Sequence, residues 1–138
     1  KILWSRKLPD SSRLWIIIAG LSGAFTVGLG AYGWHTLDEG PDYLRESFNI
    51  GVQYHMWHTL ALIGVAWLCK HGAKRLASFA GCAFCSGIIL FSGSLYYFGL
   101  TSELLISGAA PLGGGCFMLG WALLALSAIR AKAKNVPD

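Results

Sequence analysis

Residues Val52–Ile63 read VQYHMWHTLALI, an apolar segment that contains three strongly polar side chains. Gln53, His55 and His58 stand among residues that otherwise favour the interior of a membrane or of a protein. A polar side chain at membrane depth is costly unless a partner satisfies it. The segment therefore indicates a helix that is covered by protein or that carries a polar site, and its surroundings depend on the rest of the chain.

The whole chain is unusually apolar. Of its 138 residues, 54% are hydrophobic and only 13% are charged, whereas a soluble domain carries about 25% charged residues. Four hydrophobic stretches each approach the ~20 residues that cross a ~30 Å hydrocarbon core. They cover residues 14–34, 47–69, 76–100 and 112–129. The sequence predicts an all-α protein, in which one membrane domain over residues 1–138 forms a four-helix transmembrane bundle.

The basic residues predict the orientation of this bundle. Ten of the eleven Lys and Arg residues lie in the N-terminal segment, in the turn between the second and third stretches, and in the C-terminal tail. With four spans, these three segments share one side, and the acidic residues 38–46 lie on the other. The positive-inside rule then places both termini on the matrix or cytoplasmic side. The splitting of the charge over three short segments also argues against a nucleic-acid partner.

Two of the predicted helices carry informative faces. In the second, Arg45, Asn49 and Gln53 recur every four residues, while the two histidines share a different face. Polar groups on more than one side indicate a helix that is central in the bundle or covered by a partner. In the first, small residues at intervals of four are typical of close helix packing within the chain or with a partner; they are Gly20, Ala24 and Gly28.

The histidines allow three interpretations. His35 ends the first stretch and should come near the leaflet where the second begins, so we group His35, Gln53, His55 and His58 as one intramembrane polar cluster. Such a cluster hydrogen-bonds within the bundle, handles protons or ions, or binds a metal. A haem needs axial ligands on facing helices, and only His35 lies outside the second stretch. We therefore expect no metal, and the absence of a nucleophile–base or phosphate-binding motif predicts a protein that is not an enzyme.

Basic residues beside the apolar stretches have two roles. They determine topology, and they also suit contacts with anionic lipid head groups such as that of cardiolipin. A bound phospholipid is the one non-protein component that we expect. The candidate head-group contacts are Lys70, Lys74, Arg75, Arg130 and Lys132.

Four motifs occur in the order that one family shows. They are AYGWH (Ala31–His35), QYHMWHTLALIG (Gln53–Gly64), GIILFSGSLYYFGLTS (Gly87–Ser102) and APLGGGCFMLGWALLAL (Ala110–Leu126). Over residues 14–129 the chain resembles the transmembrane-protein-256-like family, also called domain-of-unknown-function family 423. The Tyr-Gly-x-His form that includes His35 is similar to eukaryotic members, although Trp34 and Thr36 depart from the usual small neighbours. The resemblance implies a small four-helix membrane protein, mitochondrial in eukaryotes, and gives no role to its histidines.

These observations favour a non-catalytic accessory subunit of a mitochondrial inner-membrane respiratory complex. Its role would be to pack helices and lipids, with other membrane subunits and phospholipids as partners. The alternative is a small oligomeric transporter or channel whose polar pathway uses Gln53, His55 and His58. The sequence names neither the partner nor a transported substrate.

Overall fold

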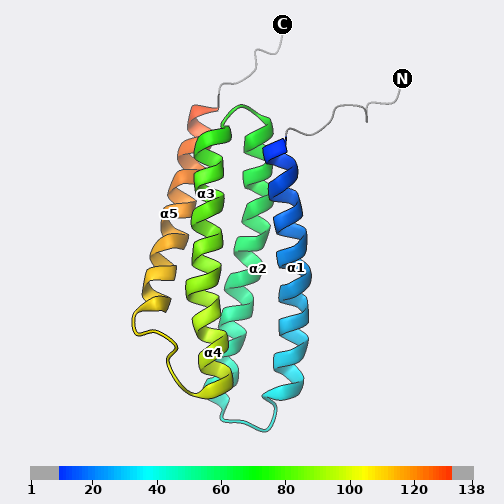
Figure 1. The fold of residues 1–138 in the computed structure, drawn as a ribbon, viewed down its shortest axis with the longest axis vertical. Coiled ribbons are helices and arrows are strands. Elements are labelled where there is room, and N and C mark those ends of the chain that lie inside the picture. Colours follow the sequence, from blue (N-terminus) through cyan, green and yellow to red (C-terminus); the bar gives the residue numbers. More distant parts are fainter. Residues whose placement is uncertain (1–9, 132–138) are drawn as a thin grey trace, which may run out of the picture.

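Four long helices form the structure, a computed structural model that describes residues 10–131 (Figure 1). The elements are α1 (Asp10–Thr36), α2 (Asp42–Lys70), α3 (Lys74–Gly87), the π-helical turn η2 (Ile88–Ser92), α4 (Gly93–Thr101) and α5 (Ala109–Arg130). α3, η2 and α4 follow one another without a break and make up the third long helix. Residues 10–131 contain no strand. The predicted all-α bundle is confirmed, and each predicted hydrophobic stretch lies within one long helix.

The chain turns where local sequence breaks the helices. α2 starts directly after Pro41, with the acidic Asp42 in its first turn, and ends on the basic Lys70. Both charges are favourable at those ends of the helix dipole. Gly72, in the turn before α3, and Gly108, just before α5, have φ angles of +99° and +84°. Glycine reaches this left-handed region without steric cost, which allows these two tight connections.

α2 is the central helix. It contacts α1 on one side and the α3–η2–α4 helix on the other, and it also touches α5. α1 and α5 lie at opposite edges and have no contact within the described chain, as Figure 1 shows. The bundle is therefore an open row rather than a closed ring of four helices. The central position agrees with the prediction drawn from the polar groups of this segment.

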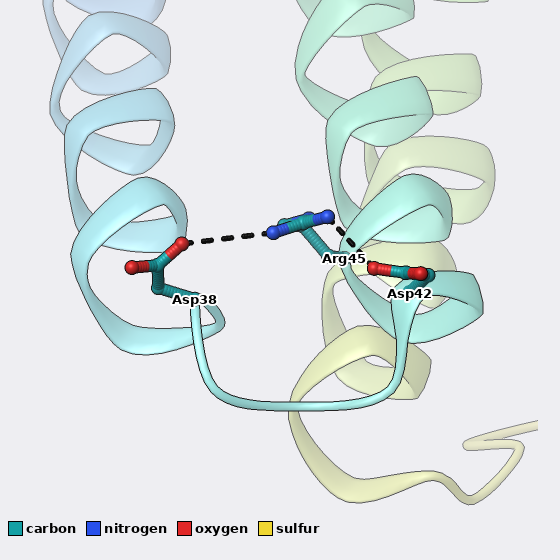
Figure 2. A network of polar contacts seen from close by, with 3 residues as sticks. All are labelled: Asp38, Asp42 and Arg45. Atoms are coloured by element: carbon teal, nitrogen blue, oxygen red, sulfur yellow. Dashed lines mark hydrogen bonds and ion pairs between the residues drawn. The ribbon is translucent and has the colours of Figure 1, made fainter.

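The two ends of the bundle differ in charge. The start of α1, the α2–α3 turn and the end of α5 lie at one end (Figure 1), where Lys70, Lys74, Arg75 and Arg130 gather. At the other end, Arg45 ties α2 to the loop that follows α1 (Figure 2). Its Nη1 lies 3.6 Å from Asp38 Oδ1 and its Nη2 lies 2.7 Å from Asp42 Oδ1. The side of the membrane that each end faces stays a prediction.

The described helices are not equally suited to lipid. By length and composition, three are apolar enough to cross a membrane: α1, the helix Lys74–Thr101 and α5. α2 is long, with 29 residues, but it is absent from this group because Gln53, His55 and His58 interrupt its apolar sequence. From the sequence we predict four membrane-spanning stretches without distinguishing among them. In the structure α2, the least apolar of the four long helices, has the most protein neighbours.

Aromatic side chains fill the space that glycines leave on facing helices. A Cβ atom added to Gly33 would lie 2.5 Å from the Phe48 ring. A Cβ atom added to Gly120 would lie at the same distance from the Phe84 ring. Trp15 covers Gly81 at a similar distance. In a membrane, where burial of apolar surface drives little association, such close packing holds helices together.

The small-residue stripe predicted on α1 does not make these contacts. Gly20, Ala24 and Gly28 are exposed, and a Cβ on either glycine would meet nothing within 4 Å. α1 instead meets α2 through Gly23, Gly30 and Gly33. Both sets have helical spacing, so the sequence could not show which of them faces α2. Contact of the outer stripe with a partner chain stays a prediction.

The third long helix contains a local change of winding. In η2 the Gly93 N–H donates to the Ile88 carbonyl, five residues back. A π turn holds one residue more than an α turn and so changes the direction of every following side chain. Here it brings the backbone of Phe91 against Gly113 of α5. Ser92 is fully buried, and its hydroxyl has no hydrogen-bond partner among the described residues.

Candidate functional site

His58 is buried between α2 and α5 with both ring nitrogens engaged. Nδ1 lies 2.6 Å from the Tyr54 carbonyl oxygen, and the Trp121 indole N–H points to Nε2 over 3.2 Å. The ring stacks on Phe117, with 3.5 Å between centroids and 7° between planes. A carbonyl only accepts and an indole N–H only donates, so Nδ1 carries the proton and Nε2 accepts. His58 is therefore held as one tautomer of the neutral imidazole.

This arrangement limits the chemistry of His58. A metal would need the Nε2 lone pair, which already accepts the hydrogen bond from Trp121. A second proton on Nε2 would point at the donor N–H of the indole. Within the described residues, no group of three or more His, Cys, Asp or Glu side chains is placed to hold a metal ion. The geometry suits a side chain that joins two helices.

His55 is the centre of a separate buried network. Its Nε2 lies 2.9 Å from Ser22 Oγ on α1, and its Nδ1 lies 3.0 Å from the Tyr96 hydroxyl on α4. Ser22 Oγ is also 2.7 Å from Thr59 Oγ1, and the Thr26 hydroxyl donates to the Ser22 carbonyl. The network joins α1, α2 and α4 through groups that each donate and accept.

The order Ser22–His55–Tyr96 has the outline of a nucleophile, a base and an orienting group. Two features argue against acyl transfer here. Ser22 lies in the middle of α1, where the helix itself uses the backbone N–H groups that would stabilise an oxyanion. Its hydroxyl also bonds to Thr59 as well as to the imidazole. We therefore describe the network as a polar link between three helices.

The structure does not bring the four residues of the predicted polar cluster together. His55 and His58 are both buried, but they contact different helices. Gln53 lies on the exposed face of α2, and His35 is exposed at the end of α1. Helical spacing alone separates these directions, because Gln53 and His55 are two residues apart and so lie on different sides of one helix.

The predicted lipid contacts divide in a similar way. Lys74, Arg75 and Arg130 line one hollow where the start of α3 meets the end of α5. Lys70 is exposed at the end of α2 but does not line that hollow. Within the described residues none of these four forms an ion pair. Lys132 lies outside the described residues.

Sequence reasoning missed the partners of the two histidines. The missed residues of the His55 network are Ser22, Thr59 and Tyr96. The missed partner of His58 is Trp121, whose indole N–H donates a hydrogen bond to Nε2. A signal existed for some of them, because Ser22–Thr26 and His55–Thr59 are polar pairs four residues apart in apolar helices. Trp121 had no such signal, since an indole in an apolar helix also suits lipid.

Replacing Trp121 with phenylalanine should destabilise the protein by about 1–2 kcal/mol, because the His58 Nε2 lone pair is left buried and unpaired. Adding His58→Leu should recover part of the lost stability, since removing both hydrogen-bond partners costs less than leaving one of them buried without a partner. Unfolding in mixed detergent micelles measures both changes. Trp57→Phe is the matched control, because Trp57 is exposed to a similar extent, 52% against 48% for Trp121, and its indole N–H makes no hydrogen bond among the described residues. Equal losses for both tryptophans would contradict the assignment.

Comparisons with known proteins agree with this fold. A family model described as protein of unknown function (DUF423) matches residues 29–114. The UPF0382 membrane protein YwdK of Bacillus subtilis (strain 168) is 37% identical over 120 residues, which are 86% of this chain and 98% of that protein. The UPF0382 inner membrane protein YgdD of Escherichia coli (strain K12) is 35% identical over 127 residues, 91% of this chain and 97% of that protein. No solved structure matches significantly.

These two relatives are bacterial, so they do not support the eukaryotic form suggested by the motif around His35. They do support the broader prediction. The family model covers more than half of the chain, and the relatives match over nearly their whole length. The chain therefore belongs to the DUF423, or UPF0382, family and is a multi-pass integral membrane protein.

Proposed function

We propose that this chain is a non-catalytic structural subunit that packs against other subunits in a larger inner-membrane assembly. The observation that carries the proposal is the outer face of α2, which the other helices leave uncovered. This outer face consists of Glu46, Asn49, Gln53, Trp57, Leu60 and Trp67, all exposed. Their spacing of three, four and seven residues places them along one side of the helix.

The Gln53 amide of this face lies at a level where lipid is expected. Val52 of α2 packs at Gly30 of α1, six residues before α1 ends at Thr36 and about 9 Å along the axis from that end. Tyr32 and Trp34 are exposed between this level and the helix end. On α2, Gln53 lines one hollow with Asp42, Arg45, Glu46, Asn49 and Ile50, and it is the member farthest from the start of the helix. An amide that faces hydrocarbon without a partner costs free energy, which a neighbouring subunit would avoid.

The buried polar groups support a structural role rather than a catalytic one. The His58 nitrogens are both used within the chain, and His55 links three helices. Lipid contact is a second part of the proposal: the hollow formed by Lys74, Arg75 and Arg130 offers three cations to an anionic phospholipid such as cardiolipin.

The narrowest form of this proposal is an accessory subunit of a mitochondrial respiratory complex. Only the motif resemblance supports it, and the bacterial relatives place the family in bacterial membranes as well. The transporter alternative gains no observation here, because Gln53 and the two histidines face different surroundings within one chain.

Extraction from the native membrane in mild detergent should yield a particle that contains other membrane subunits, seen by native mass spectrometry. Gln53→Leu should lower the recovery of those subunits, while the neighbouring exposed Ile50, changed to leucine, should leave it unchanged. Retained phospholipid in the same particle tests the lipid contacts, which Arg75→Gln should weaken. A particle that contains this 14.9 kDa chain and no other protein would overturn the proposal.

A further inference from the structure

We infer that the loop between α4 and α5 inserts three side chains into the boundary between lipid head groups and acyl chains, and so anchors that end of the bundle. The side chains are Leu104, Leu105 and Ile106, with 71%, 55% and 62% of their surface accessible. A group of large aliphatic side chains that is exposed together marks a contact surface. The inference does not depend on the proposed subunit role, because it concerns the lipid around the chain and not a protein neighbour.

The loop lies beside the last turns of α4, because α5 begins before the level at which α4 ends. Gly113 lies against the Phe91 backbone, and α5 begins four residues before Gly113, about 6 Å along the axis. The third long helix continues from Phe91 to Thr101, about 15 Å in the same direction. The loop therefore runs back by about 9 Å to reach α5, as Figure 1 shows.

This part of the molecule coincides with the edge of the lipid. α5 has 22 residues and is about 33 Å long, close to the ~30 Å of the hydrocarbon core. With α5 across the core, its first residue marks the edge, and the loop occupies the head-group layer just outside it. Trp34 and Tyr43 are exposed at the same end of the bundle, and such aromatic residues favour the interface.

The distribution of charge agrees with this level. No charged residue lies between Glu103 and Arg130, so the apolar sequence that continues through α5 begins in the loop itself. Leu112 and Met118 continue the exposed apolar surface along α5, with 68% and 76% of their surface accessible. The lipid that covers α5 therefore reaches the loop, and Glu103 marks the side that faces water.

The backbone limits how deep the loop lies. Among residues 10–131, no hydrogen bond uses the N–H groups of Leu104, Leu105 and Ile106. A loop with such groups does not occur in the hydrocarbon core, because lipid tails offer them no partner. The head-group layer supplies water and phosphate oxygens. The backbone thus stays in that layer while the side chains reach the acyl boundary, as in interfacial helices.

Lipid suits three consecutive side chains better than a protein partner does. Outside a helix, neighbouring side chains point in different directions, and all three are exposed here. Fluid acyl chains cover every direction at once, whereas a folded partner covers one face.

Depth-dependent fluorescence quenching tests the inference. Leu105→Cys is made in the full chain with its four native cysteines replaced, labelled with an environment-sensitive fluorophore and reconstituted in phosphatidylcholine vesicles. Glu39→Cys, in the exposed α1–α2 loop at the same end, is the control. We expect the label at position 105 to emit at a shorter wavelength and to be several-fold less quenched by aqueous iodide. A nitroxide near the lipid head group should quench it more than a nitroxide deep in the acyl chain.

The neighbouring side chains test the anchoring itself. Leu104→Ser together with Ile106→Ser should raise iodide quenching of the label several-fold, towards that of the control. Leu104→Ile with Ile106→Leu should leave the quenching unchanged, because aliphatic surface is kept. A label that stays shielded after the two serine changes would overturn the anchoring role.

Three results with the labelled loop would overturn the inference as a whole. They are equal iodide quenching at both loops, strongest quenching by the deep nitroxide, and a label shielded from iodide that neither nitroxide reaches. The third result would indicate a protein cover in place of lipid.

Discussion

Phe48→Ala should lower the free energy of unfolding by about 3–5 kcal/mol, the cost of removing a phenyl ring from a packed core. The Phe48 side chain has no accessible surface. Its ring lies against Gly33 of α1, its Cβ lies against Gly99 of α4, and the Tyr96 ring is 4.9 Å away between centroids. Three helices therefore meet on this one side chain. The two glycines cannot fill the space that the ring leaves, so the cavity would persist.

Reversible unfolding in mixed detergent micelles, followed by circular dichroism, measures this loss. Phe79→Ala is the matched control: it is the same substitution on α3, but 59% of the Phe79 surface is accessible. A change within about 0.5 kcal/mol is expected there. If the two variants lost equal stability, the packing of α1, α2 and α4 around Phe48 would be wrong.

Gly113→Ala should cost about 3 kcal/mol, at the upper end of the range for overpacked cores. The added methyl group would run into the Phe91 backbone nitrogen and would lie 2.8 Å from Phe91 Cβ. A side chain could rotate away, but a backbone atom moves only if the whole of η2 moves. The substitution therefore forces α5 away from the third long helix, which is its main neighbour.

Gly115→Ala provides the control for this position. Gly115 is two residues further along α5, and a Cβ on it would meet nothing within 4 Å. Alanine should stabilise the protein there by about 0.5–1 kcal/mol, because it favours a helix more than glycine does. The same unfolding measurement compares both variants. Opposite signs are expected, and a neutral Gly113→Ala variant would contradict the close approach at η2.

Much of the fold follows from hydropathy and charge. The four long helices and the central position of α2 were predictable, because apolar length gives the spans and polar residues on several sides require protein neighbours. The choice between glycine stripes on α1 was not predictable. Gly20–Ala24–Gly28 and Gly23–Gly30 both suit close packing, and only the facing side chains of α2 distinguish them.

The candidate site was predictable only in part. The polar residues of α2 mark it as unusual, but spacing cannot tell which groups meet across helices. His58 hydrogen-bonds to Trp121, which is 63 positions away in the sequence. His55 hydrogen-bonds to Ser22, which precedes it in the sequence, and to Tyr96, which follows it. Periodicity describes one helix at a time, whereas these contacts depend on the rotation and height of each helix relative to its neighbours.

The π turn at Ile88–Ser92 has a consequence for how this protein can vary in length. Before it, Phe84 faces α5 at Gly120, and after it, Tyr96 faces α2 at His55. The wider turn accommodates one extra residue between these two contacts. Deleting one residue within it would restore an uninterrupted α-helix in which Phe84 and Tyr96 keep nearly the same relative direction, whereas a deletion elsewhere between them would turn Tyr96 by roughly 100°. The third long helix can therefore lose one residue at Ile88–Ser92, while the same loss elsewhere between Phe84 and Tyr96 would separate His55 from its hydroxyl partner.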